Sequence, residues 1–208
     1  MPQNRNDKDT IRLTTIPCFT LALCLILLAC ALFISGCSKG AGGNSLHVKS
    51  AATGEKDLAI KSSYAFAVTK SFTDTSNNIT MASAYNVYAA NYDLDAANFA
   101  MTLNKPLTAD DQLRVEFSLI GEQGTDGKTP PKAGTYSAKA DKFMKVETVG
   151  LVSRKGAADS KVWLDRSTLT GEVKVTSVSG DTMSGDVDLT AGDTTIKGSF
   201  TTKILTRK

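Results

Sequence analysis

Few residues in this 208-residue chain combine the side-chain types and the spacing that enzyme chemistry requires. The only histidine, His47, lies in or beside a Gly- and Ser-rich segment, where we expect it to be solvated. Ser-His-Asp and Cys-His sites need a positioned imidazole beside the nucleophile, so the sequence favours neither. After Cys37 there is no Gly-x-Ser-x-Gly, Ser-x-x-Lys or Gly-rich phosphate-binding motif. We therefore predict a protein that is not an enzyme.

One segment has the donor spacing of a metal site. Asn91, Asp93 and Asp95 place three oxygen donors two residues apart, as calcium-binding loops do. The segment lacks the glycine of such loops, and Thr102 stands at the twelfth position, where a glutamate normally closes the site. Hairpin turns are rich in Asn and Asp for backbone reasons alone. We predict no metal and no cofactor, with these three residues as the candidates to check.

A second group of carboxylates lies near the C-terminus. Glu172, Asp186 and Asp188 fall on neighbouring predicted strands, where two acids could serve a glycosidase. They lie on the predicted solvent face beside Lys174 and Lys197, so charge pairing across strands is the role that the sequence favours.

The N-terminal region has the pattern of an exported chain. Its first twelve residues are weakly positive, and residues 13–38 carry no charge at all. Small residues, Ser35 and Gly36, end the apolar stretch immediately before Cys37. This order of charged, apolar and small residues is typical of a secretory signal peptide.

The six residues Leu32-Phe33-Ile34-Ser35-Gly36-Cys37 resemble the lipobox of bacterial lipoproteins. The resemblance implies cleavage between Gly36 and Cys37, and attachment of a diacylglycerol and acyl chains such as palmitate to Cys37. Cleavage would remove the other three cysteines, so the mature domain would have no disulfide and no cysteine-based metal site. The alternative is an uncleaved anchor, because 26 uncharged residues are long enough to span a bilayer.

Either reading places the domain outside the cytoplasm and tethers it to a membrane. Ser38, rather than an acidic residue, follows Cys37, which in a Gram-negative cell suggests the outer membrane, facing the periplasm. We expect three segments: a signal peptide over 1–36, a lipidated cysteine with a flexible tether over 37–56, and one β-rich domain over 57–208.

Charge is unevenly distributed along the predicted mature chain. Residues 37–127 carry 7 basic and 10 acidic side chains, whereas residues 128–174 carry 10 basic and 5 acidic ones. A basic face could attract anionic lipid headgroups or acidic glycans. Acidic residues are interleaved, however, and no run of aromatic residues accompanies the lysines, so we favour a solvated sheet surface and predict no nucleic-acid partner.

Alternation with a period of two residues predicts β-strands in most of the domain. It is clearest over 169–206, where the turns at Gly180 and Gly192 predict a three-strand antiparallel meander. Leu113 to Leu119 alternates in the same way, with Arg114 and Glu116 on the opposite face from the apolar residues. Further strands are expected at 58–68, 136–140, 143–152 and 161–164.

Residues 81–101 fit two patterns. Tyr85, Tyr88 and Tyr92 have helical spacing, but Tyr85, Val87 and Ala89 also alternate. We favour a hairpin that turns at residues 93–95. About nine strands then predict an all-β protein, an antiparallel β-sandwich, with a small up-and-down β-barrel as the alternative. An apolar signal helix and the flexible tether would precede it.

Large aromatic residues could form either a core or a binding surface, and we favour the core; they are Tyr64, Tyr85, Tyr88, Tyr92, Tyr136 and Trp163. The segments 134–136, 171–178 and 196–200 resemble those of β-rich bacterial lipoproteins of unknown function. Together these features predict a lipid-anchored, non-catalytic cell-envelope domain that binds an envelope protein or polymer. The alternative is a lipocalin-like barrel that carries a small apolar ligand.

Overall fold

In the computed structural model, which describes residues 44–156 and 158–205, nearly all of the chain forms β-strands. The strands are β1 (Ser45–Ser50), β2 (Gly54–Ala59), β3 (Ser62–Thr73), β4 (Ile79–Ala90), β5 (Leu113–Gln123), β6 (Gly134–Ser137), β7 (Lys145–Lys155), β8 (Ala158–Trp163), β9 (Thr170–Ser179), β10 (Thr182–Ala191) and β11 (Thr194–Leu205). One short helix, α2, spans Phe99–Asn104. Within the described ranges there is no helix with the length and apolar character that crossing a membrane requires.

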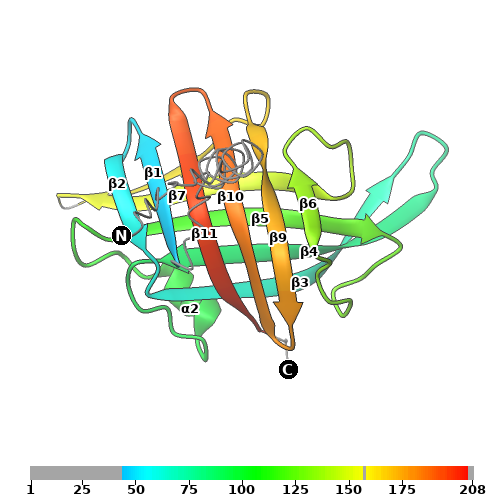
Figure 1. The fold of residues 1–208 in the computed structure, drawn as a ribbon, viewed down its shortest axis with the longest axis horizontal. Helices are drawn as coiled ribbons and strands as arrows, with labels where there is room; N and C mark the ends of the chain where they lie inside the picture. Colours follow the sequence, from blue (N-terminus) through cyan, green and yellow to red (C-terminus); the bar gives the residue numbers. More distant parts are fainter. Residues whose placement is uncertain (1–43, 157, 206–208) are drawn as a thin grey trace, which may run out of the picture. The chain divides into compact units, whose positions relative to one another are not determined.

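The strands belong to one sheet that closes on itself, and the all-β prediction is confirmed. Its order is β10-β9-β6-β7-β5-β4-β3-β11-β1-β2, and β11 also pairs with β10. All pairings are antiparallel except two short parallel ones, β6 with β7 and β11 with β3. Figure 1 shows β9, β10, β11 and β1 running across β3, β4 and β5, which lie behind them. The sheet therefore has two crossing layers, as in an orthogonal sandwich, joined into a closed ring of strands.

A single apolar core fills the space between the two layers. The predicted meander supplies one side of it through β9, β10 and β11, whose turns contain Gly180 and Gly192 with positive φ. Phe200 of β11 meets Phe117 of β5 edge to face, with ring centroids 5.3 Å apart. Tyr136 is fully buried in the same core. The buried aromatic residues of the interior thus come from both layers.

The tether predicted over 37–56 extends too far toward the C-terminus. Residues 45–56 contain β1 and the first part of β2, and the side chains of Leu46 and Val48 are buried in the core. β1 pairs with β11 on one side and with β2 on the other. Six residues with two apolar side chains give a short pattern, and the pairing that stabilises it comes from the other end of the chain.

The hairpin predicted within residues 81–101 is also wrong in its second half. β4 ends at Ala90, and its hairpin partner is β3, through a turn at residues 74–78. Residues 99–104 form α2 instead of a strand. Phe99 explains the difference, because it packs against the rings of Tyr64, Phe66 and Tyr88 on the outer face of the sheet.

The segment that contains α2 covers a buried ion pair on β5. Arg114 Nη2 lies 2.7 Å from Glu116 Oε1, and both side chains are at most 5% exposed. Arg114 also donates to the hydroxyl of Tyr92 (2.9 Å) and to the carbonyl of Leu103 (3.2 Å). Lys161 of β8 approaches Glu116 Oε2 at 2.9 Å. Both faces of β5 are therefore buried: the core covers one, and on the other residues 91–106 cover Arg114, whereas Phe72 and Phe143 belong to the cluster that buries Ile120.

Removing one member of this pair should destabilise the protein more than removing both. Glu116→Leu leaves the Arg114 guanidinium buried without its carboxylate, a situation that costs about 3–5 kcal/mol. Arg114→Met combined with Glu116→Leu removes both charges, and we expect it to recover at least about half of that loss. Urea unfolding of the three proteins measures the difference. A double variant as unstable as Glu116→Leu would contradict the proposed cause.

Candidate functional site

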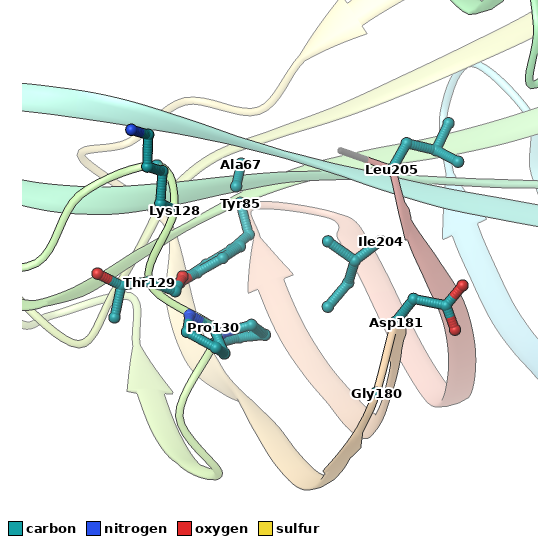
Figure 2. A pocket seen from close by; sticks show the side chains of 11 residues that line it. Ala67, Tyr85, Lys128, Thr129, Pro130, Gly180, Asp181, Ile204 and Leu205 are labelled. Atoms are coloured by element: carbon teal, nitrogen blue, oxygen red, sulfur yellow. The ribbon is translucent and has the colours of Figure 1, made fainter. Parts of the chain in front are cut away.

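A pocket of about 440 Å³ lies at one end of the sheet. The side chains of Ala67 in β3 and Tyr85 in β4 form its inner wall, and residues 127–131 form a second wall. The turn between β9 and β10 and the end of β11 complete it. Figure 2 shows Tyr85 and Pro130 on one side of this space and Ile204 on the other, with Asp181 at its edge.

The wall formed by residues 127–131 is held by short-range hydrogen bonds. The Asp126 carboxylate accepts bonds from the backbone N–H groups of Lys128 (2.9 Å) and Thr129 (3.0 Å). These bonds lower the pKa of Asp126, and the bond from the N–H of Lys128 is the largest cause. Gly127 donates to the hydroxyl of Thr69, and a Cβ at this position would lie 3.0 Å from the backbone of β3. A glycine thus lets the loop approach the strand closely.

Two buried tyrosines support the same loop from inside the sheet. The hydroxyl of Tyr85 donates to the carbonyl of Thr129, and that of Tyr136 donates to the carbonyl of Lys132 (3.0 Å). Burial raises the pKa of Tyr85, and it raises the pKa of Tyr136 to about 12. Both phenols are therefore neutral donors at physiological pH, and their role is to hold the loop.

The opposite wall is fixed by the turn between β9 and β10. The backbone N–H of Ile204 donates to the carbonyl of Asp181 (2.6 Å), and Lys203 Nζ lies 3.4 Å from the Asp181 carboxylate. The carboxylate of Asp181 at the pocket edge thus has a cationic neighbour, and both side chains are exposed to solvent. On this side of the pocket, the side chain of Ile204 faces the hollow.

These contacts make the pocket suited to binding an apolar group. Its walls are mainly apolar, the Tyr85 hydroxyl and the Asp181 carboxylate have partners in the protein, and Lys128 adds one ammonium group to the lining. Ligand pockets in proteins are typically apolar hollows of about 300–1,000 Å³ with few polar groups. Among the residues that line this pocket there is no pair of nucleophile and base.

The candidate metal ligands do not converge. Asn91 bonds to the backbone of Leu113 and Asp111, whereas Asp93 pairs with Lys61 at 2.8 Å. Asp95 accepts three bonds from residues 97 and 98, and those from Asn98 are the main cause of its lowered pKa. Within the described part of the chain, no three His, Cys, Asp or Glu residues are grouped as metal ligands would be.

The three carboxylates predicted on the meander, Glu172, Asp186 and Asp188, are likewise spread over an exposed face. Asp188 forms an ion pair with Lys197 (3.1 Å), and Asp186 lies opposite Lys174 in the register of β10 and β9. Glu172 lies opposite Asp188. Asp186 and Asp188 thus lie beside lysines, as expected for charge pairing across strands, whereas Glu172 faces another carboxylate. All three lie on the exposed face of the strands and not in a cleft.

His47 has carboxylate neighbours although it lies on the surface. Its Nδ1 lies 2.7 Å from Asp57 and its Nε2 lies 3.2 Å from Glu55, both on β2. The hydrogen bond that the imidazole donates to the Asp57 carboxylate is the main cause of the raised pKa of His47. The imidazole is 43% exposed, so it is part of a surface charge cluster on a strand rather than of a tether.

The remaining predicted residues are divided between core and surface. Tyr85 and Tyr136 are buried, as favoured, whereas Trp163 is 54% exposed and lies against the backbone of Gly150. Tyr64, Tyr88 and Tyr92 are half-buried against the outer cluster around Phe99. Gly36 and Cys37, the predicted cleavage and lipidation residues, lie outside the described residues.

Sequence reasoning missed the residues that form the pocket. Pro130 and Pro131 are typical of a loop, because proline cannot donate to a strand ladder, but nothing in the sequence says which strand ends this loop meets. Tyr85 was expected in the core, and its hydroxyl reaches the loop. No family model, curated protein or solved structure matches this chain.

The raised pKa of Tyr136 predicts how the stability of the protein depends on pH. Its pKa is near 10 in the unfolded chain and about 12 in the native protein, so the unfolded state loses this proton first as pH rises. The stability associated with neutral Tyr136 is complete below pH 10 and is lost between pH 10 and about 12. Tyr136→Phe should be less stable than the wild type at pH 8, by about 1 kcal/mol from the lost hydrogen bond. The deficit should shrink at pH 11 in urea unfolding; parallel curves for the two proteins would contradict this.

Proposed function

We propose that this protein is a lipid-anchored, non-catalytic binding domain of the bacterial cell envelope. The domain works outside the cytoplasm, attached through Cys37, and in a Gram-negative cell it faces the periplasm from the outer membrane. It binds an envelope protein or polymer, and the contact inserts an apolar group of that partner into the pocket between residues 127–131 and Ile204. The pocket is the observation that carries the proposal.

The chemistry of the pocket supports binding rather than catalysis. An apolar group gains roughly 25 cal/mol for each Å² removed from water, without needing a polar partner. The walls are held by hydrogen bonds that do not involve a ligand, so the pocket needs little rearrangement before binding. The Tyr85 hydroxyl and the Asp181 carboxylate have partners in the protein, and the Lys128 amine at the rim has no second group beside it in the pocket lining that would form a pair of nucleophile and base.

The position of β1 supports an anchor close to the domain. Seven residues, 38–44, separate Cys37 from Ser45, the first residue of β1. Fully extended, a linker of this length spans at most roughly 25 Å. A domain on so short a linker stays near the membrane, which suits a partner in the envelope rather than one in solution.

A carrier of small apolar ligands is the second candidate. Large side chains such as Phe117, Tyr136 and Phe200 occupy the space between the sheet layers, so a ligand would not enter the centre as in a lipocalin-like barrel. The end pocket is large enough for one small apolar molecule. The two candidates thus share the pocket and differ in its occupant.

The uncharged apolar fluorophore N-phenyl-1-naphthylamine tests the pocket directly. We expect saturable binding to the wild type, and binding weaker by about tenfold in Ala67→Leu, because the added methyl groups fill the inner wall. Ala100→Leu adds the same volume on an exposed position of α2 and should bind as the wild type does. Ile204→Ser should also weaken binding, by making the opposite wall polar.

Circular dichroism melts show which variants remain folded. Equal affinity in folded wild type, Ala67→Leu and Ile204→Ser would refute the pocket as the binding site. Competition then distinguishes the two candidates: displacement by a lipid extract indicates a carrier, and displacement by an envelope protein or polymer indicates the binding domain.

A further inference from the structure

The strand β8 forms an open edge of the sheet. Among the described strands it pairs only with β7, with Gly150 opposite Trp163 and Lys155 opposite Ala158. All six of its residues are exposed, including Val162 at 37% and Trp163 at 54%. An unpaired strand edge carries free backbone donors and acceptors that can extend the sheet with another strand.

The register of the β7–β8 hairpin shows which backbone groups are free. The N–H of Leu164 donates to the carbonyl of Val149 (2.8 Å), so the backbone N–H and C=O groups of residue 164 are directed toward β7. Backbone groups alternate in direction along an antiparallel strand, so those of residues 162, 160 and 158 are also directed toward β7. The backbone N–H and C=O groups of Asp159, Lys161 and Trp163 are directed away from β7, where a further strand could pair with them.

Another exposed edge, that of β2, shows how such an edge can be blocked. The N–H of Ile60 donates to the carbonyl of Asn44, so residues 55, 57 and 59 point outward by the same alternation. Glu55 and Asp57 are both acidic, and pairing β2 with a second β2 would bring carboxylates together. Like charges directly opposite each other destabilise a strand pair.

The charges along β8 have the opposite property, because they complement themselves. Two β8 strands can form hydrogen bonds only in registers where the residues with outward backbone groups, 159, 161 and 163, lie opposite residues of the same kind. Near the centre of the strand, one such register sets Asp159 against Asp159 and another sets Lys161 against Lys161. The register between them sets Asp159 of each copy against Lys161 of the other, with Ser160 facing Ser160.

We propose that two copies of this chain pair antiparallel through β8, with Ser160 on the two-fold axis and two Asp159–Lys161 pairs beside it. The arrangement uses the same strand on both copies, so it closes as a dimer and does not grow into a fibre. It continues the sheet of one copy into the sheet of the other. The proposal is independent of the pocket and of the lipid anchor.

Local contacts hold the two charged side chains in place for this pairing. The Asp159 carboxylate accepts bonds from the N–H of Leu107 (2.7 Å) and from Arg154 (3.2 Å). Lys161 Nζ lies 2.9 Å from Glu116 and 4.4 Å from the centroid of the Trp163 ring. A carboxylate has about four acceptor positions and an ammonium group has three donors, so each can also bond to the second copy.

A disulfide across the axis tests the register. In this register Ser160 and its counterpart form a non-hydrogen-bonded pair with Cα atoms about 4.5 Å apart, which lies within the range that a disulfide can bridge. We expect the Ser160→Cys variant of the full chain, oxidised mildly in its membranes, to give mostly cross-linked dimer. Ser177→Cys, at an exposed position of β9 away from the edge, measures random cross-linking and reactions of the native cysteines.

Two further measurements complete the test. Adding Asp159→Asn and Lys161→Gln to Ser160→Cys removes both charges while keeping polar side chains, and we expect the dimer yield to fall by about threefold or more. Native mass spectrometry of the wild type in mild detergent should show a dimer. Cross-linking of Ser160→Cys no greater than that of Ser177→Cys, a wild type that remains monomeric, or a β8 bound to a different protein would overturn the proposal.

Discussion

The structure depends on the position of β11, which closes the sheet. One edge of this twelve-residue strand pairs with β10 along most of its length. The other edge is shared, because β1 pairs with residues 195–199 and β3 pairs with residues 203–205. Gly198 allows the close approach of β1, since a Cβ at this position would lie 2.3 Å from the carbonyl oxygen of Ser45. Without this strand the two layers would not share a core, and the pocket would lose Ile204 and Leu205.

Each layer is completed by an irregular segment, and the two segments differ in chemistry. Residues 91–106 cover the first part of the outer face of β5, where they add an aromatic cluster and contact the buried Arg114–Glu116 pair. Residues 124–133 cover the end of the core and are held by Asp126, Tyr85 and Tyr136. The first segment fills its space with side chains, whereas the second leaves a hollow between itself and β11. This contrast is why the proposed binding site lies at the end of the sheet.

Regular parts of this fold were predictable from the sequence because their information is local. The meander over 169–206 combines strict alternation with glycines at Gly180 and Gly192, where the backbone needs positive φ. By contrast, β1 is a strand because β11, about 150 residues later, pairs with it. The buried state of Arg114 follows from a covering segment that its own alternation cannot reveal. The pocket depends in the same way on three segments that meet only in the folded chain.

The proposed role joins a membrane anchor to a binding pocket, and mass spectrometry of the full-length protein, gently extracted from its own membranes, tests this directly. The account predicts a chain that begins at Cys37 and carries acyl groups on that residue, and it predicts a bound apolar molecule or envelope partner that survives extraction. A chain that retains residues 1–36 and carries no lipid would contradict the anchor. A lipidated chain that repeatedly emerges without any bound partner would contradict the binding role.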